Sequence, residues 1–175
     1  MKEVMIFGKV RRDPITGDTP NHRMNANSKN RFNILAAVTV KGGKVSPLQY
    51  VVTQACTNAA IFLQFVKVLL EEGTLSRGGI FVLDNCSVHV KGDNLGLAEH
   101  LLNEEGILLL TLPPYHPELN PTELVFNTLL QRLKSKRARY NSLDAEDFLD
   151  AIYIELSSIS LGDVAEFFVK CGYLY

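Results

Sequence analysis

The chain has 175 residues, a hydrophobic fraction of 46% and a net charge of −1. This length suits one domain with a substantial core, and the near-zero charge excludes an overall basic surface, so any DNA-binding region must be local. The three cysteines lack CxxC spacing, which argues against a zinc site, and the absence of a long apolar run or signal-peptide pattern predicts an intracellular domain without a membrane partner.

The first 30 residues carry few signals of regular structure. The apolar run Val4–Phe7 is a candidate strand. Residues 11–30 are rich in Arg, Asn, Pro, Gly and Asp, and this composition predicts an exposed loop. We therefore expect residues 1–30 to form a poorly defined N-terminal segment.

A β-hairpin is predicted next. Residues 32–40 and 44–52 are rich in β-forming residues, and Lys41-Gly42-Gly43 separates them. The glycines supply the positive φ angles that a tight turn needs. Both faces of residues 32–40 carry apolar side chains, which is typical of a strand covered on two sides.

Two helices and two strands follow. Thr57-Asn58 offers an N-cap for a helix that ends near Gly73, and Asp93 or Asn94 can cap a helix that reaches about Glu105. The leucines expected to face the core from the second helix are Leu97, Leu101 and Leu102. The apolar runs Ile80–Leu83 and Ile107–Leu110 predict buried strands. The helix between them supplies the crossover that parallel neighbours require.

The last third of the chain is predicted to be helical. Asn120-Pro121-Thr122-Glu123 places an N-cap, a proline at the first position and a glutamate in the first turn of a helix that reaches about Arg137. Further helices over residues 144–157 and 163–171 form a C-terminal helical extension, residues 140–175. The order of elements predicts a single domain with a mixed α/β sheet flanked by helices.

Two carboxylates are candidate metal ligands. Asp84 closes the Ile80–Leu83 strand, and Glu123 lies in the first turn of a later helix, so both can converge on one cleft. Two hard oxygen ligands can hold Mg²⁺ and leave positions for a substrate phosphate. Each residue also has a structural interpretation: an aspartate after a strand often bonds the next turn, and Glu123 can complete a capping box.

Two stretches carry a family resemblance. Leu83-Asp84-Asn85 with Ser87-Val88-His89, and the segment LPPYHPELNPTE at residues 112–123, resemble the DDE endonuclease domain of Tc1/mariner and IS630-type transposases. The second stretch is long and nearly contiguous, so the match is specific. The resemblance covers residues 31 to about 139.

The resemblance implies an RNase H-like fold and two-metal phosphodiester chemistry on DNA with Mg²⁺ or Mn²⁺ as cofactor. Asp84 is then the second acidic ligand and Glu123 the third. Transposon-end DNA is the implied partner, with a homodimer left open. The implied location is the nucleus in a eukaryote and the cytoplasm otherwise.

The first acidic residue that the resemblance implies is missing. It belongs on a buried central strand beside the Asp84 strand, whereas Asp13 and Asp18 lie in turn-like contexts and Glu3 precedes the Val4–Phe7 run. We therefore expect a truncated chain that lacks the first strand of the fold. Such a chain would expose a hydrophobic sheet edge and be defective in strand transfer.

Basic residues cluster at the end of the Glu123 helix. The predicted nucleic-acid-binding residues are His89, Arg132, Lys134, Lys136 and Arg137. One interpretation is favourable placement of positive charge at a helix C-terminus. The other is contact with DNA phosphates, with His89 as a loop residue that touches phosphate. Hard Mg²⁺ prefers oxygen ligands, so His89 is a poor metal ligand.

Three functional hypotheses follow. The first is a truncated DDE transposase domain for metal-dependent DNA cleavage and strand transfer, which includes the case of an inactive remnant. The second is a non-catalytic DNA- or protein-binding module that retains the fold. The third is a stand-alone nuclease that recruits an acid from elsewhere.

Overall fold

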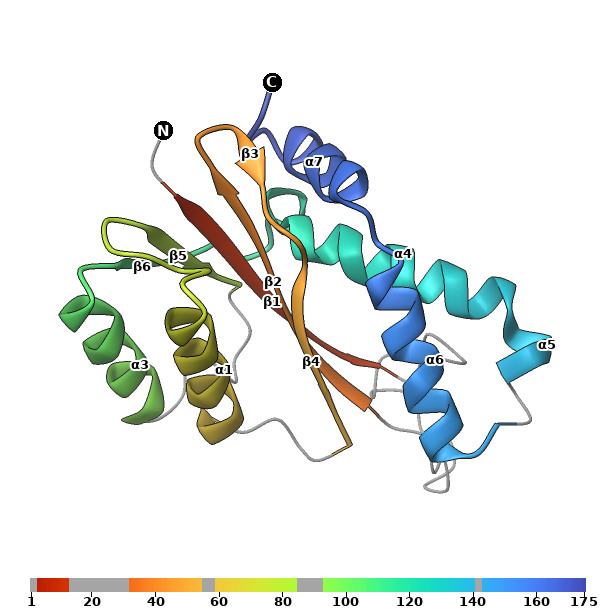
Figure 1. Ribbon diagram of the computed structural model, residues 1–175. Helices are drawn as coiled ribbons and strands as arrows, with labels where there is room; N and C mark the ends of the chain where they lie inside the picture. Colours follow the sequence, from red (N-terminus) through yellow and green to blue (C-terminus); the bar gives the residue numbers. More distant parts are fainter. Residues whose placement is uncertain (1–2, 13–31, 55–58, 85–92, 141–142) are drawn as a thin grey trace.

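In the computed structural model, the chain forms one mixed sheet with helices packed on it (Figure 1). The structure describes residues 3–12, 32–54, 59–84, 93–140 and 143–175. Its strands are β1 (Val4–Arg12), β2 (Phe32–Lys41), β3 (Lys44–Val45), β4 (Gln49–Thr53), β5 (Ile80–Leu83) and β6 (Leu108–Thr111). The helices are α1 (Ala59–Glu71), α3 (Asp93–Glu104), the short 3₁₀ helix η1 (Pro117–Leu119), α4 (Pro121–Ser135), α5 (Arg137–Tyr140), α6 (Ala145–Ser157) and α7 (Leu161–Lys170).

The strand order is β3-β2-β1-β5-β6, and β4 also pairs with β2. Strand β1 is antiparallel to β2 and parallel to β5. Strands β5 and β6 are parallel, with Val82 opposite Leu110. This confirms the predicted parallel pair and the predicted mixed sheet flanked by helices.

Strand β1 occupies the central position that we expected to be empty. Its pairing with β2 extends from Val4 opposite Val40 to Arg12 opposite Phe32, well beyond the apolar run that ends at Phe7. The predictions of a missing first strand and of a poorly defined segment are therefore wrong for Val4–Arg12. The polar end of β1 has no local strand signal, and the long partner strand β2 provides its pairing instead.

The predicted hairpin is confirmed, with a break in its second strand. Gly42 and Gly43 have φ angles of 58° and 79°, the left-handed values that a tight turn between β2 and β3 requires. The second strand is interrupted at Pro47, which separates β3 from β4 because proline has no N–H for the ladder. Residues 32–40 of β2 are all buried, as expected for a strand covered on both faces.

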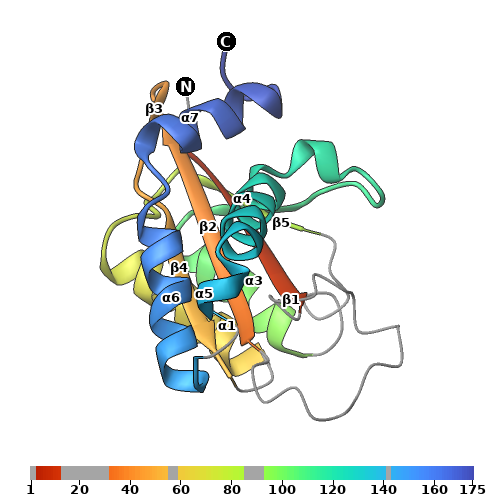
Figure 2. The same cartoon turned by 90° about the vertical axis from the view of Figure 1, so that its right-hand side faces the viewer.

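Helices cover both faces of the sheet (Figures 1 and 2). Alternate residues of β1 point to opposite faces, since Met5 and Phe7 belong to one core and Ile6 to the other. The first core contains side chains of α1 and α3, including Phe62, Phe65, Ala98 and Leu102. The second contains side chains of α4, α6 and α7, including Phe126, Phe148 and Phe168.

The predicted burial of residues 107–110 is confirmed for Ile107 and is wrong for Leu108 and Leu110. Leu108 and Leu110 of β6 are 53% and 45% exposed, because β6 is an edge strand with β5 as its ladder partner. Leu97 of α3 is likewise exposed at 48%, while Leu102 is buried as expected and Leu101 is half-buried. An apolar run alone does not separate an edge strand from a central one.

The C-terminal helices are integral parts of the core. The predicted helix over residues 144–157 is α6, and Asp144 is its N-cap, with its side chain accepting hydrogen bonds from the backbone N–H groups of Glu146 and Asp147. Helix α7 begins two residues earlier than expected, because Ser160 and Asp163 form a capping box. Helix α4 packs on β1 and β2 and contacts both α6 and α7. None of the helices in the described parts of the chain is long and apolar enough to cross a membrane.

Candidate metal site at the ends of strands β1 and β5

Asp84 lies directly after β5 and next to the central strand. Its backbone N–H donates a hydrogen bond to the Phe7 carbonyl at 3.2 Å, which continues the parallel β1–β5 ladder. Val82 belongs to the core under α4, so the alternation of side chains directs Asp84 toward the same face. The residue is half-buried and its Oδ1 atom is inaccessible to solvent.

Glu123 lies half-buried in the first turn of α4, as predicted. Asn120 caps this helix through its side chain, which accepts hydrogen bonds from the Thr122 N–H at 3.1 Å and the Thr122 hydroxyl at 2.6 Å. The Asn120 N–H donates to the Pro117 carbonyl, so the predicted capping box with Glu123 is not the cap that forms. Glu123 therefore has no capping role that competes with metal binding.

Gly8 of β1 lies next to Asp84 and next to the first turn of α4, which carries Glu123. It follows Phe7, so it is the β1 residue adjacent to Asp84 in the parallel ladder. A Cβ atom added at Gly8 would lie 1.9 Å from Thr122 Oγ1 and 2.9 Å from Thr122 Cβ. Asp84 and the first turn of α4 therefore approach Gly8 from two sides. Asp84 and Glu123 thus lie at the same end and on the same face of the sheet.

The position expected for the first acidic ligand carries no carboxylate. Gly8 is the β1 neighbour of Asp84, whereas Glu3 lies at the opposite end of β1, where its carbonyl accepts a hydrogen bond from the Ile80 N–H. The buried Glu3 carboxylate accepts hydrogen bonds from Ser76 and from Lys41, the latter at 3.3 Å. Glu3 is therefore a structural residue, and Asp13 and Asp18 lie outside the described residues.

Two carboxylates at this end of the sheet would suit one divalent cation better than a pair. Asp84 and Glu123 supply hard oxygen ligands of the kind that Mg²⁺ and Mn²⁺ take. Within the parts of the chain that the structure describes, no three His, Cys, Asp or Glu side chains gather closely enough to hold a metal ion. Two cations close together need more negative charge than two carboxylates provide.

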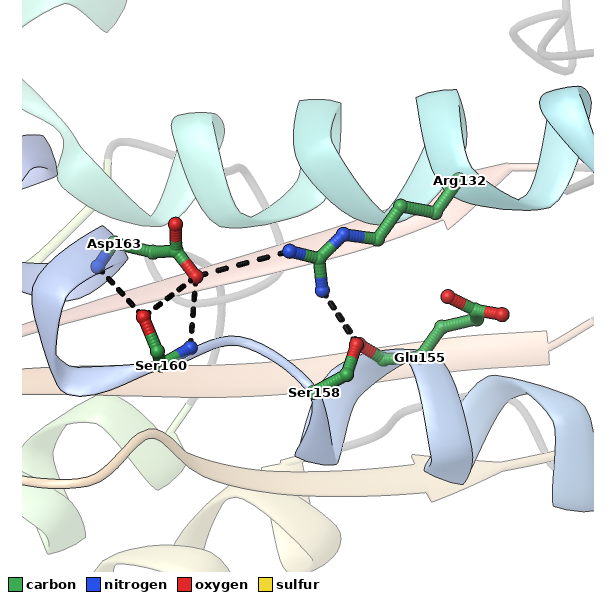
Figure 3. Close-up of polar contacts among 5 residues, drawn as sticks. All are labelled: Arg132, Glu155, Ser158, Ser160 and Asp163. Atoms are coloured by element: carbon green, nitrogen blue, oxygen red, sulfur yellow. Dashed lines mark hydrogen bonds and ion pairs between the residues drawn. The ribbon is translucent and has the colours of Figure 1, made fainter.

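The basic cluster at the end of α4 makes intramolecular contacts. Figure 3 shows Arg132 reaching from α4 to the Ser158 hydroxyl at 2.5 Å and to the Asp163 carboxylate at 3.7 Å. Lys136 pairs with Glu155 at 2.6 Å, and Lys134 is exposed. Arg132 and Lys134 lie in the last turn of α4, as the interpretation of charge placement at a helix C-terminus expects. Arg132 and Lys136 also bond to residues of α6 and α7. DNA binding by these residues stays a prediction, since His89 and the Arg137 side chain lie outside the described residues.

Glu155 is a buried carboxylate that residue patterns did not single out. Burial alone would raise its pKa, but hydrogen bonds from Lys136 and Tyr140, both at 2.6 Å, outweigh that effect and lower the pKa below the ordinary value. The sequence signal that could have identified Glu155 is its position as a charged residue among the apolar residues of the buried face of α6. Glu155 therefore anchors α6 to the end of α4.

The connection from β6 to α4 returns the chain to the candidate site. It begins at Thr111, opposite Leu83, and ends at the cap of α4. Within it, His116 Nδ1 lies 2.7 Å from Glu118 Oε1, and this hydrogen bond lowers the pKa of the exposed Glu118 carboxyl. Glu118 is therefore engaged locally with His116, one loop away from Glu123.

The chain is similar to known transposases and integrases. A model of the DDE superfamily endonuclease family matches residues 12–145. The Mos1 transposase catalytic domain with raltegravir and Mn is 13% identical, with a TM-score of 0.59, and the match covers 96% of this chain and 76% of that one. The Mos1 strand transfer complex is 17% identical, with a TM-score of 0.58, and this chain spans about half of that chain (97% and 50% coverage).

An integrase core domain has a similar fold. The catalytic core domain of BIV integrase is 17% identical, with a TM-score of 0.51, and the match covers 89% of this chain and 82% of that one. No curated protein sequence matches the chain. The structural similarity shows a common RNase H-like fold despite the low sequence identity. The family model matches most of the sequence. The chain belongs to the DDE superfamily of endonucleases.

Proposed function

We propose that this chain is a Tc1/mariner-type transposase domain that acts on DNA and binds one divalent cation, Mg²⁺ or Mn²⁺, through Asp84 and Glu123. One observation carries the proposal: Asp84 and the first turn of α4 approach Gly8 from two sides at the same end of the sheet. A cation there would polarise a phosphodiester oxygen and offset its negative charge. The presence of Mn in a structurally similar Mos1 catalytic domain supports the choice of ion.

DNA is the proposed substrate. The similar Mos1 chain was solved as a strand transfer complex, and the similar BIV protein is an integrase catalytic core. The chain has no net positive charge, so its affinity for DNA depends on local cations such as Lys134. We expect weak, salt-sensitive DNA binding by the isolated chain.

A second candidate function is a non-catalytic DNA-binding module. Gly8 favours it, because the central strand supplies no carboxylate beside Asp84. A site with two carboxylates is expected to hold one cation and to position two poorly. Cleavage and strand transfer by this chain should then be slow or absent, whereas DNA binding should persist.

Mn²⁺ titration and DNA cleavage test the proposal together. The wild-type chain is titrated with Mn²⁺ by calorimetry, alongside Asp84→Asn, Glu123→Gln and the matched control Glu118→Gln. We expect Asp84→Asn and Glu123→Gln each to weaken Mn²⁺ binding by at least about tenfold, since each removes one of two charged ligands. Glu118→Gln should bind Mn²⁺ like the wild type, because Glu118 is engaged with His116.

The cleavage assay separates the two functions. Rapid Mn²⁺-dependent cleavage of transposon-end DNA that is lost in Asp84→Asn would favour the catalytic transposase domain. DNA binding without cleavage would favour the binding module. Equal Mn²⁺ affinity in the wild type, Asp84→Asn and Glu123→Gln would reject the metal site.

A further inference from the structure

Gly8 and Thr122 are packed against each other in a way that leaves no room for a side chain beside Asp84. A Cβ atom at Gly8 would lie 1.9 Å from Thr122 Oγ1, 2.9 Å from Thr122 Cβ and 3.3 Å from Phe126 Cε2. The first two distances are shorter than real Cβ contacts. Any residue other than glycine at position 8 therefore requires a shift of the β1 backbone or of α4.

Thr122 cannot give way by rotating its side chain. Its hydroxyl donates a hydrogen bond to Asn120 Oδ1 at 2.6 Å, which ties the rotamer to the cap of α4. Rotation would leave Thr122 Cβ in place, still 2.9 Å from the added atom. Thr122 is fully buried, so its displacement would also disturb the packing of α4 on β1.

Two-metal chemistry needs a further carboxylate beside Asp84 and Glu123. The β1 position adjacent to Asp84 and in contact with the first turn of α4 is the natural place for a carboxylate shared with Asp84 and Glu123. At that position the chain has Gly8, and the Thr122 side chain fills the remaining space. The residues present therefore disagree with a site for two metal ions.

We infer that Gly8 and Thr122 form a matched pair that closes the third ligand position and restricts this site to a single divalent cation. This inference rests on the proposed metal site at Asp84 and Glu123. It also explains why the chain needs no missing strand to lack the first acid: β1 is present, and its residue beside Asp84 contributes close packing instead of a ligand.

A double-mutant cycle tests the packing part through thermal stability. Gly8→Ala should lower the Tm by roughly 2–12 °C, the shift expected from overpacking in a chain of this length. Thr122→Gly removes both clashing atoms, so Gly8→Ala in that background should cost less than half as much. Gly96→Ala is the control, since nothing lies within 4 Å of its added Cβ, and it should keep or raise the Tm.

The outcomes of the cycle are distinct. Failure of Gly8→Ala to fold, with folding restored in Gly8→Ala/Thr122→Gly, would support the inference. An unchanged Tm for Gly8→Ala, additive effects in the cycle, or no recovery in the double variant would overturn it. None of these results depends on whether the chain binds metal or cleaves DNA.

Metal stoichiometry tests the ligand part. The wild type should bind one Mn²⁺ per chain, counted from the free-ion signal in electron paramagnetic resonance, and Gly8→Asp/Thr122→Gly should bind two. Two equivalent ions in the wild type, or one ion in the folded double variant, would overturn the inference. Absence of any Mn²⁺ binding in the wild type would instead reject the proposed function, and the stability cycle would still decide the packing claim.

Discussion

The two faces of the central sheet are packed with different chemistry. On the face covered by α1 and α3, the Phe7 ring lies with its centroid 5.1 Å from Phe62, 5.7 Å from Phe65 and 6.0 Å from Phe81. The face covered by α4, α6 and α7 adds a polar network to its apolar core, in which Glu155 accepts hydrogen bonds from Lys136 and Tyr140. The candidate metal site belongs to this second face.

The two faces of the sheet contribute differently to the fold. Apolar packing is non-directional and scales with buried area, so the aromatic cluster on the α1/α3 face supplies stability without fixing one arrangement of partners. Hydrogen bonds to a buried carboxylate require particular partners at particular distances, so the α4/α6/α7 face has one well-defined arrangement. The face that carries Asp84 and Glu123 is thus also the face whose helices are held by directional contacts.

The largest expected effect comes from truncating the aromatic cluster. Phe7→Ala should lower the free energy of unfolding by about 3–5 kcal/mol, because it leaves a cavity among three other rings. Phe7→Leu should recover much of this loss. Urea denaturation of both variants measures the effect, and a loss below about 1 kcal/mol for Phe7→Ala would contradict close packing in this aromatic cluster.

Neutralising the buried carboxylate should have an intermediate effect. Glu155→Gln weakens two hydrogen bonds to a charged acceptor, and we expect a loss of about 2 kcal/mol in the free energy of unfolding. The control Glu166→Gln breaks the exposed pair with Lys170 and should cost less than about 0.5 kcal/mol. Equal effects in urea denaturation would mean that the polar network is no stronger than a surface ion pair.

Stability should fall in acid through the same network. Hydrogen bonds lower the pKa of Glu155 below 4.5, and bonds from the Ser160 backbone and hydroxyl lower that of Asp163 below 3.8. A lowered folded-state pKa means that the stabilising contribution is present above the unfolded value and is lost as pH falls through the folded one. The Tm measured from pH 7 to pH 3 should decline below about pH 4.5, and less steeply in Glu155→Gln. Identical profiles would contradict the assignment to Glu155.

The smallest effect on stability is expected at Lys134. This side chain is exposed, so Lys134→Ala should change the free energy of unfolding by less than about 0.5 kcal/mol. If the end of α4 contacts DNA, the same variant should weaken DNA binding at every sequence and reduce the salt slope by about 1. Fluorescence anisotropy at several salt concentrations measures both quantities. An unchanged slope would leave the basic cluster with its intramolecular role alone.

Local patterns were sufficient to predict most individual elements and the two carboxylates. The glycines between β2 and β3, the N-cap at Asn120 and the apolar run before Asp84 are short-range signals, and each corresponds to the element predicted from it. The residues at 112–123 and the Asp84 segment indicated the family, which the match over residues 12–145 confirms. The roles of Asp84 and Glu123 as metal ligands stay predictions.

Most strands and helices, and the N-cap at Asn120, follow from the sequence, because their signals lie within a few residues of one another. Tertiary contacts place Val4–Arg12 at the centre of the sheet, leave β6 as an exposed edge and set Gly8 between Asp84 and Thr122. These facts depend on pairing between segments far apart in the chain: β1 contacts β2 and β5 across long separations, and Thr122 reaches Gly8 from α4. Burial and ligand geometry are properties of such non-local contacts, so a run of residues cannot encode them alone.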